Sequence, residues 1–516
     1  MTVTEPKAES VLKPAMVLMA GRMLAFVATF FIPVALARAL HPAAFGTYKQ
    51  LFLIQNTVFY IAQMGMATTL YYFLPQNRGA IGRYIANSTT FLGAAGLAGM
   101  ALMIVAAPEI ANWMHNDALA AYLPWMGGYL ALTMLASPLE IVLIAQARYG
   151  WASTAYTLTD FGRAVAFITT ALVFHSLDWL VKSAVAIAAL RMVATLFYFK
   201  REFGKDLRIH SGLFRSQCAY AFPFAFAVMI EILQGSLPQY MVSYLTNPVA
   251  FAIFAVGCLQ IPLVDLATSP ASDVMMVKMQ ESIARGHRAA ALEIWHDTTW
   301  KLALLFFPLT VLVIAAARET ILLLYTQRYE ASVPLFMAWS LLILTSTFQV
   351  DGVLRVFAQT RWLLCLNLVR LGIVAGLIYG SLQGLQLLGP VLVIVAANAC
   401  FKLLALVRIR VLLDTDFRGL LPRRRLAALL RASIGAAGPV LLVKFQVSAP
   451  PLKLLLLMVP LYITTYVALI WRFALLDERE REAFSNWARK AAQGILPFKG
   501  RNDSRLGGLG VENAGD

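Results

Sequence analysis

The segment YFKREFGKDLRIHSGLFRSQ, residues 198–217, is the longest polar interruption in the first half of the chain. About six apolar runs precede it and about six follow it, each long enough to cross a bilayer core of about 30 Å as a helix. A second basic stretch at 408–426 comes before one last pair of apolar runs, which ends at residue 475. This pattern predicts an all-α polytopic membrane protein with about 14 transmembrane helices, arranged as two six-helix lobes plus a C-terminal helix pair.

The two polar linkers also predict how the chain is divided. Each of them is rich in Lys and Arg, which marks segments that stay on the cytoplasmic side of a membrane. The predicted parts are an N-lobe at 1–199, a cytoplasmic inter-lobe linker at 200–217, a C-lobe at 218–407, a basic cytoplasmic linker at 408–426, the final helix pair at 427–475 and a cytoplasmic tail at 476–516.

Composition and charge agree with a membrane protein. The chain is 60% hydrophobic and only 14% charged, whereas soluble domains carry about 25% charged residues. About thirty-one of the 43 Lys and Arg residues fall in every second gap between apolar runs, which predicts that both termini are cytoplasmic. The net charge of +16 is therefore explained by membrane topology. Because the basic residues form short clusters and no continuous face, we expect no nucleic-acid partner.

The gaps assigned to the outer side contain no candidate catalytic cluster. The largest of them, around 108–122, is too short for a folded domain, and an enzyme such as a polysaccharide polymerase or ligase would need an acid, a base or a metal site there. The chain has no Walker A motif for ATP hydrolysis. Its four cysteines show no metal-ligand spacing. These observations favour a transporter without a cofactor or bound metal.

Charged residues inside the apolar runs are the candidate site, because an ion in the hydrocarbon region usually faces a cavity or a partner. Asp160 and Arg163 stand three residues apart and can pair on one helical face. Arg22 has no acid three or four residues away, so its partner must come from another helix or a ligand. The candidate substrate-binding residues are Arg22, Asp160, Arg163, Arg191, Glu231, Asp265 and Arg370.

The roles expected for these charges differ. Arg22 and Arg370 are the cations we expect to meet an anionic headgroup such as a pyrophosphate, for which the guanidinium fork is suited. Glu231 and Asp265 would lie near Arg22 if the first, seventh and eighth spans meet. Other charges lie near span ends, where a long side chain can reach the interface; these are Glu140, Asp273 and Lys402.

Three stretches resemble a known family. They are ALARALHPAAFGTYKQLFLIQNTVFYIAQMGMATTLYYFLPQ at 35–76, VSYLTNPVAFAIFAVGCLQIPLVDL at 242–266 and ILLLYTQRYEASVPLF at 321–336. They are similar to segments of the polysaccharide and oligosaccharide flippases within the multidrug, oligosaccharidyl-lipid and polysaccharide exporter superfamily. The matching elements of the first stretch are Ala37, Arg38, Leu40, Phe45, Gly46, Tyr48, Gly65 and the run 71–75.

The resemblance implies a function and a location. Such flippases move an undecaprenyl-pyrophosphate-linked oligosaccharide across the bacterial inner membrane by alternating access, for O-antigen, capsule or exopolysaccharide assembly. It implies a lipid-linked glycan and the bilayer as partners, with a polysaccharide polymerase and the export machinery as candidate further partners. We expect a monomer.

An H+ or Na+ gradient could drive the cycle of such a flippase. Relatives often carry an Asp-Lys pair in the seventh span, where this chain has Pro238 and Gln239, and a proline after the eighth span, where it has Val277. These departures count against ion coupling through that site. Two alternatives remain, a multidrug or cation antiporter of the same superfamily and a membrane polysaccharide polymerase or ligase.

Overall fold

The structure is a computed structural model that describes residues 9–447, 449–475 and 482, without the side chains of 9–20, 22, 24, 223, 224, 226 and 227. The predicted tail at 476–516 therefore lies almost wholly outside the described residues. The first part of the chain forms α1 (Glu9–Ala39), α2 (Pro42–Gln63), α3 (Thr69–Gln76), α4 (Ile81–Val105), α5 (Ala107–Trp113), α6 (Ala118–Ala136), α7 (Leu139–Ala145), α8 (Tyr149–Phe174) and α9 (Leu177–Phe203).

The second part of the chain is helical as well. It forms α10 (Ser211–Leu245), α11 (Pro248–Gly257), α12 (Pro262–Ala284), α13 (Arg288–Ala315), α14 (Ala317–Tyr325), α15 (Val333–Ser346), α16 (Val350–Val356), α17 (Thr360–Leu385), α18 (Leu388–Leu412), α19 (Arg423–Gln446) and α20 (Pro451–Arg472). Two short 3-10 turns, Arg78–Ala80 and Gln327–Ser332, precede α4 and α15.

The number of membrane-spanning helices is at least ten. Among the described residues, ten helical segments are long and apolar enough to cross a bilayer, and the pair α11 and α12, bent by 52°, gives an eleventh if it is one span. The other predicted spans coincide with α1, with α2 and with α10. An all-α polytopic membrane protein is thus confirmed, while the count of about 14 stays a prediction.

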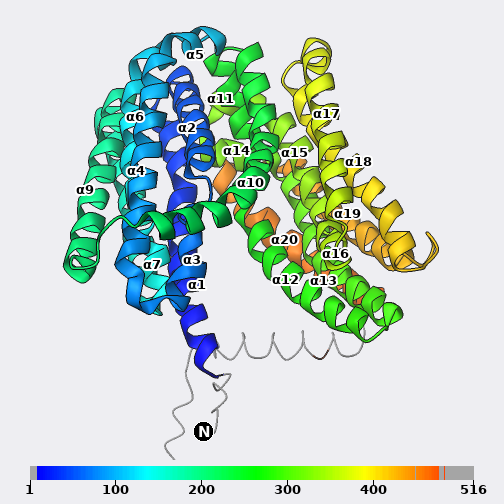
Figure 1. The fold of residues 1–516 in the computed structure, drawn as a ribbon. Coiled ribbons are helices and arrows are strands. Elements are labelled where there is room, and N and C mark those ends of the chain that lie inside the picture. The colour runs from blue at the N-terminus through cyan, green and yellow to red at the C-terminus, as the bar shows by residue number, and fades with distance from the viewer. Residues whose placement is uncertain (1–8, 448, 476–481, 483–516) are drawn as a thin grey trace, which may run out of the picture.

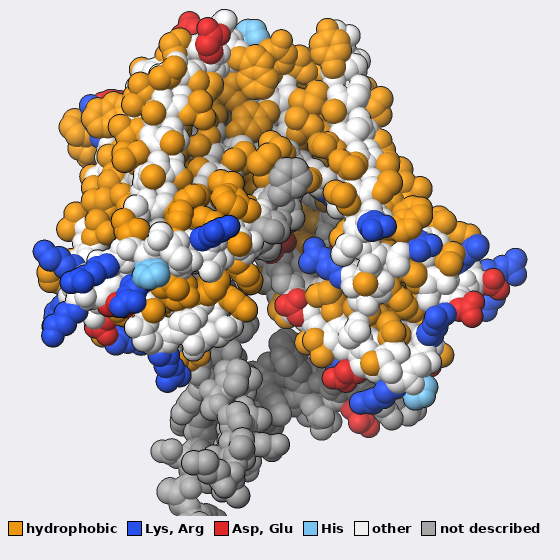
Figure 2. Space-filling model, in the orientation of Figure 1, with side chains coloured by type: hydrophobic (Ala, Val, Ile, Leu, Met, Phe, Trp, Pro, Cys, Tyr) orange, Lys and Arg blue, Asp and Glu red, His pale blue; other side chains and the backbone are white. Residues whose placement is uncertain are grey.

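The helices are arranged in two groups that flank a hollow. Figure 1 shows α1 to α9 gathered on one side and α12, α13 and α16 to α18 on the other. Figure 2 shows that this face is hollowed between the two groups in its lower part, and that Lys and Arg side chains lie along the lower part beneath a broad apolar belt. The predicted lobe boundaries stay a prediction.

The two groups meet where α2, in the first group, packs against α10 and α11, which belong to the second. Both α2 and α11 begin with a proline at the first helical turn and a side-chain cap, from His41 and Asn247, a combination that favours helix initiation. A Cβ on Gly46 would lie 1.9 Å from the carbonyl oxygen of Pro248, so only glycine allows the start of α11 to approach α2 this closely.

Polar contacts reinforce this meeting line, which we call the seam. Gln50 on α2 donates its Nε2 to the Oγ of Ser243 on α10 at 2.7 Å. Asn116 donates to the Oε1 of Gln50 at 2.6 Å and fixes that amide. Arg38, at the end of α1, donates its Nε to the carbonyl oxygen of Leu324 at 2.9 Å and also bonds the carbonyl of Leu323. The seam is therefore closed by hydrogen bonds as well as by buried apolar side chains from both groups.

The final helix pair packs against α13 and α14. Tyr466 on α20 donates its hydroxyl to the carbonyl oxygen of Leu304 at 3.0 Å. Lys444 on α19 forms an ion pair with Glu319 on α14, with 3.0 Å between Nζ and Oε2. A cluster of buried apolar side chains from α13, α19 and α20 completes the contact.

Candidate functional site

A cavity of about 720 Å³ lies within the first group of helices, and we call it the N-cavity. Side chains from α1, α2, α6, α7, α8 and α9 surround it, and many of them are tyrosines and amides. The polar and charged residues that line it include Tyr48, Gln55, Asn56, Tyr60, Gln63, Tyr129, Glu140, Arg163 and Arg191. A polar cavity inside apolar helices is the expected place for a transported polar group.

The cations of the N-cavity are neutralised by carboxylates. Arg191 on α9 lies 2.7 Å, Nη2 to Oε1, from Glu140 on α7, whose side chain is only 6% exposed. Arg163 lies 2.9 Å, Nη2 to Oδ1, from Asp160 one turn earlier on α8. Each guanidinium retains a buried Nε–H without an acceptor among the described residues. The N-cavity therefore carries two ion pairs with spare hydrogen-bond donors.

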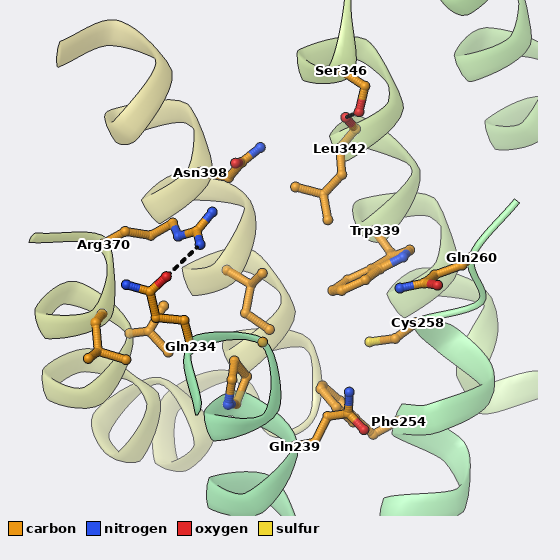
Figure 3. A pocket seen from close by; sticks show the side chains of 15 residues that line it. Gln234, Gln239, Phe254, Cys258, Gln260, Trp339, Leu342, Ser346, Arg370 and Asn398 are labelled. Atoms are coloured by element: carbon orange, nitrogen blue, oxygen red, sulfur yellow. Dashed lines mark hydrogen bonds between the residues drawn. The ribbon is translucent and has the colours of Figure 1, made fainter. Parts of the chain in front are cut away.

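A second cavity, of about 400 Å³, lies within the other group of helices, and we call it the amide cavity. Figure 3 shows Arg370 and Gln234 on one side of it and Trp339, Gln260 and Cys258 on the other. Its polar lining residues are Gln234, Gln239, Gln260, Trp339, Ser346, Arg370 and Asn398, from α10, α15, α17, α18 and the segment between α11 and α12.

Arg370 connects the amide cavity with a neighbouring one. The neighbour, of about 620 Å³, is lined by Glu231, Asp351 and Arg355 and also by Gln234 and Arg370, and we call it the charged cavity. The Nη2 of Arg370 lies 3.4 Å from the Oε1 of Gln234, a long hydrogen bond. Both side chains are thus shared by the two cavities.

Arg370 has no carboxylate partner in the described part of the chain. Its guanidinium carbon lies 5.3 Å from the ring centroid of Phe401. Two acids line the charged cavity beside it: Asp351 is paired with Lys402, with 3.1 Å between Oδ2 and Nζ, and Glu231 lies beyond ion-pair distance. Most of the five N–H donors of the Arg370 guanidinium therefore remain available to a ligand.

The residues predicted from the sequence do not gather at one site. Arg163 and Arg191 line the N-cavity, and Glu231 and Arg370 line the charged cavity. Asp265 is exposed and lines a small pocket of about 160 Å³ that shares Gln260 and Trp339 with the amide cavity. The predicted pairing of Asp160 with Arg163 is present. Arg22 lies on α1, but its side chain lies outside the described structure, so its predicted partners stay a prediction.

Sequence reasoning missed two features. The sequence predicts that Glu140 reaches the interface from a span end. This prediction is wrong, because the residue as a whole is only 4% exposed and its carboxylate is paired with Arg191. The neutral residues of the amide cavity, Gln234, Trp339 and Asn398, carry no charge to mark them. Amide side chains within the apolar runs are the sequence feature that could have identified this cavity, since an amide in hydrocarbon needs a hydrogen-bond partner.

Comparison with known proteins gives the family. Residues 35–334 match the model of the family described as polysaccharide biosynthesis protein. The chain belongs to this family. No curated protein sequence matches it closely enough to mark a relative.

Several solved structures have a fold similar to that of this chain. The lipid II flippase MurJ, in an inward closed conformation, is similar with a TM-score of 0.69 at 12% identity over 89% of this chain and 98% of MurJ. A multidrug resistance MATE family transporter of the MOP superfamily, in an inward-facing conformation, gives 0.60 at 13% identity, over 78% of this chain and 98% of its own. The Vibrio cholerae MATE transporter VcmN has a TM-score of 0.51 at 11% identity, over 79% of this chain and 99% of VcmN.

At these identities the likeness shows the fold alone. This polysaccharide biosynthesis family member is a multi-pass membrane protein with the fold shared by MurJ and the MATE transporters. The resemblance seen in the sequence is confirmed, and its structural neighbours are a flippase and transporters.

Proposed function

We propose that this protein is a flippase that moves an undecaprenyl-pyrophosphate-linked oligosaccharide across the bacterial inner membrane by alternating access, for O-antigen, capsule or exopolysaccharide assembly. The observation that carries the proposal is that polar cavities lie inside the apolar helices and that one of their cations, Arg370, forms no ion pair among the described residues. An ionised side chain at mid-bilayer costs about 3 kcal/mol on insertion scales, so a polar or anionic cargo accounts for cavities built this way.

Family and fold support the same proposal. The family model is one of polysaccharide biosynthesis, and the fold is that of a lipid II flippase. The hollow between the two helix groups opens toward the end where Lys and Arg gather, which by the positive-inside rule is the cytoplasmic end. The protein would then take its cargo from the inner leaflet, with the N-terminus and the C-terminal tail in the cytoplasm.

The decisive experiment is reconstitution. Purified protein in proteoliposomes should expose an added undecaprenyl-pyrophosphate-linked oligosaccharide to a membrane-impermeant glycosidase, and deletion of the gene should remove one surface glycan from the host. Arg318→Ala serves as a matched control, because Arg318 lies in an exposed ion pair with Glu330 and lines none of the N-cavity, the amide cavity and the charged cavity.

The alternative is a multidrug or cation antiporter, since MATE transporters share the fold. Ethidium efflux from cells that express the protein tests it. Efflux that depends on the protein, together with no movement of the lipid-linked oligosaccharide, would replace the flippase proposal with this one.

Arg22 and Arg370 are both predicted from the sequence to meet the lipid pyrophosphate, and Arg22 keeps that role in this proposal. Arg22→Ala should abolish the surface polysaccharide while the protein is still inserted and expressed at the wild-type level. Wild-type polysaccharide in that variant would exclude a headgroup role for Arg22 without touching the flippase proposal.

A further inference from the structure

The lining of the amide cavity differs from that of a phosphate site. Sites for phosphate or pyrophosphate gather several cationic or backbone N–H donors, but the amide cavity holds one cation, Arg370. Its other polar groups are the amides of Gln234, Gln239, Gln260 and Asn398, the hydroxyl of Ser346 and the indole of Trp339. This set is neutral and both donates and accepts hydrogen bonds.

Several of these groups have no partner in the described structure. The Nε2 of Gln234 is buried and lacks an acceptor. Asn398 donates its Nδ2 to the Oγ1 of Thr345 at 2.7 Å, which leaves its Oδ1 as a free acceptor. Buried polar groups are costly unless a partner satisfies them. The cavity thus offers a ligand with hydroxyl groups the Asn398 acceptor and the donors of Arg370, while the occluded Gln234 amide N–H becomes available when its side chain turns.

Trp339 adds an apolar surface to this polar set. Its ring lies opposite Arg370 and Gln234 across the cavity (Figure 3). A pyranose ring has one face of C–H groups that packs on an aromatic side chain, and its hydroxyl groups bond to amides around its edge. A volume of about 400 Å³ lies within the range of small-molecule sites, about 300 to 1,000 Å³.

From this arrangement we infer that the amide cavity is a glycan subsite that binds a sugar unit carrying a carboxylate, with Trp339 as its stacking surface and Arg370 as the partner of the carboxylate. The inference rests on the proposed flippase function and specifies its cargo as an acidic glycan. Arg370 suits this role because its guanidinium forms no ion pair among the described residues: of the two acids beside it in the charged cavity, Asp351 is held by Lys402 and Glu231 lies beyond ion-pair distance.

The experiment measures binding of free sugars to the full-length protein in lipid nanodiscs without sugar detergents. Methyl glucuronide and methyl glucoside are the probes, and saturation-transfer difference NMR reports their ring protons. We expect the glucuronide to bind about tenfold more tightly, as for one charge-assisted hydrogen bond. Trp339→Ala should abolish both signals, Trp339→Phe should retain them, and Arg370→Gln should make the two affinities equal.

Trp362→Ala is the matched control. Trp362 lies on α17 outside the cavity lining, where its ring faces Arg408, so this variant should bind both sugars as the wild type does. Equal affinities of the wild type for the two sugars, or equal weakening by Trp362→Ala and Trp339→Ala, would overturn the inference.

Inorganic pyrophosphate separates the two sources of negative charge. If pyrophosphate displaces the glucuronide from the wild-type protein, Arg370 binds the lipid headgroup and the inference is wrong. No displacement at equal concentration supports the glycan. The flippase proposal has its own test: it fails if deletion of the gene leaves every surface glycan in place. If the protein exports glycan normally but binds neither sugar, only the glycan subsite is contradicted.

Discussion

The N-cavity and the amide cavity each place arginine inside the apolar helices, but they treat its charge in opposite ways. In the N-cavity, Arg191 faces Glu140 and Arg163 faces Asp160. In the amide cavity, Arg370 contacts the amide of Gln234 and the ring of Phe401 and forms no ion pair among the described residues, although Glu231 and Asp351 line the charged cavity beside it. This contrast supports a structural role for the two neutralised arginines and a ligand-binding role for Arg370.

This difference has an energetic basis. Removal of one member of a buried ion pair leaves an uncompensated charge and is strongly destabilising. Removal of a cation that has no ionic partner leaves no such charge. Substitutions in the N-cavity should therefore lower the stability of the protein, whereas substitution of Arg370 in the amide cavity should lower its activity.

The largest effect on stability is expected for Glu140→Gln. Because Arg191 then lacks its counter-charge, the free energy of unfolding should fall by about 3 kcal/mol, as for other buried pairs. Thermal melting of the purified protein in detergent measures this. The double variant Glu140→Gln/Arg191→Gln should recover most of the loss, and a double variant as unstable as the single one would contradict the role given to this pair.

The next effect concerns function and falls on Arg370→Gln. We expect the rate of oligosaccharide movement in proteoliposomes to fall about tenfold, which corresponds to one charge-assisted hydrogen bond of about 1.5 kcal/mol. The melting temperature should stay close to that of the wild type. If melting falls as far as in Glu140→Gln, then Arg370 stabilises the fold and the contrast between the cavities disappears.

A smaller effect is expected for Asp160→Asn. The pair with Arg163 lies within one helical turn, and about a third of each side chain is exposed. Such pairs contribute about 0.5 kcal/mol, so melting should hardly change. Asp178→Asn, which removes the similarly spaced but more exposed pair with Lys182, is the control, and a much larger loss at Asp160 would show that its pair is part of the N-cavity's support.

Cysteine labelling tests which side of the membrane the cavities face. In a cysteine-free background, Glu231→Cys at the charged cavity and His287→Cys between α12 and α13 should react with an impermeant reagent only from the cytoplasmic side. Asp117→Cys at the start of α6 should react only from outside. These three side chains are exposed. Reaction of Glu231→Cys from outside would show that the hollow opens to the outer side of the membrane.

The fold could be predicted from the sequence because a bilayer imposes simple constraints. Apolar runs of span length and alternating basic gaps predict polytopic helices, and the short helices that interrupt them, such as α5 and α14, leave this pattern intact. The i,i+3 pair of Asp160 and Arg163 was predictable because it is local.

The site was only partly predictable because its contacts are not local. Arg191 meets Glu140 from another helix, and no spacing in the sequence encodes that pairing. The amide cavity combines neutral residues from helices far apart in the chain. Charge identified Arg370, but Gln234, Trp339 and Asn398 became visible only when the helices were placed in space.

The seam between the helix groups is fastened by amides, an arginine and backbone carbonyls around Gly46. Water can replace such hydrogen bonds one for one, so each contributes only about 1 kcal/mol net once solvent enters. The seam also contains buried apolar side chains from both groups, among them Phe45, Phe251 and Tyr329, and these have to be separated against the hydrophobic effect. The cost of opening this end of the molecule therefore lies mostly in its apolar contacts, because water can take over its hydrogen bonds.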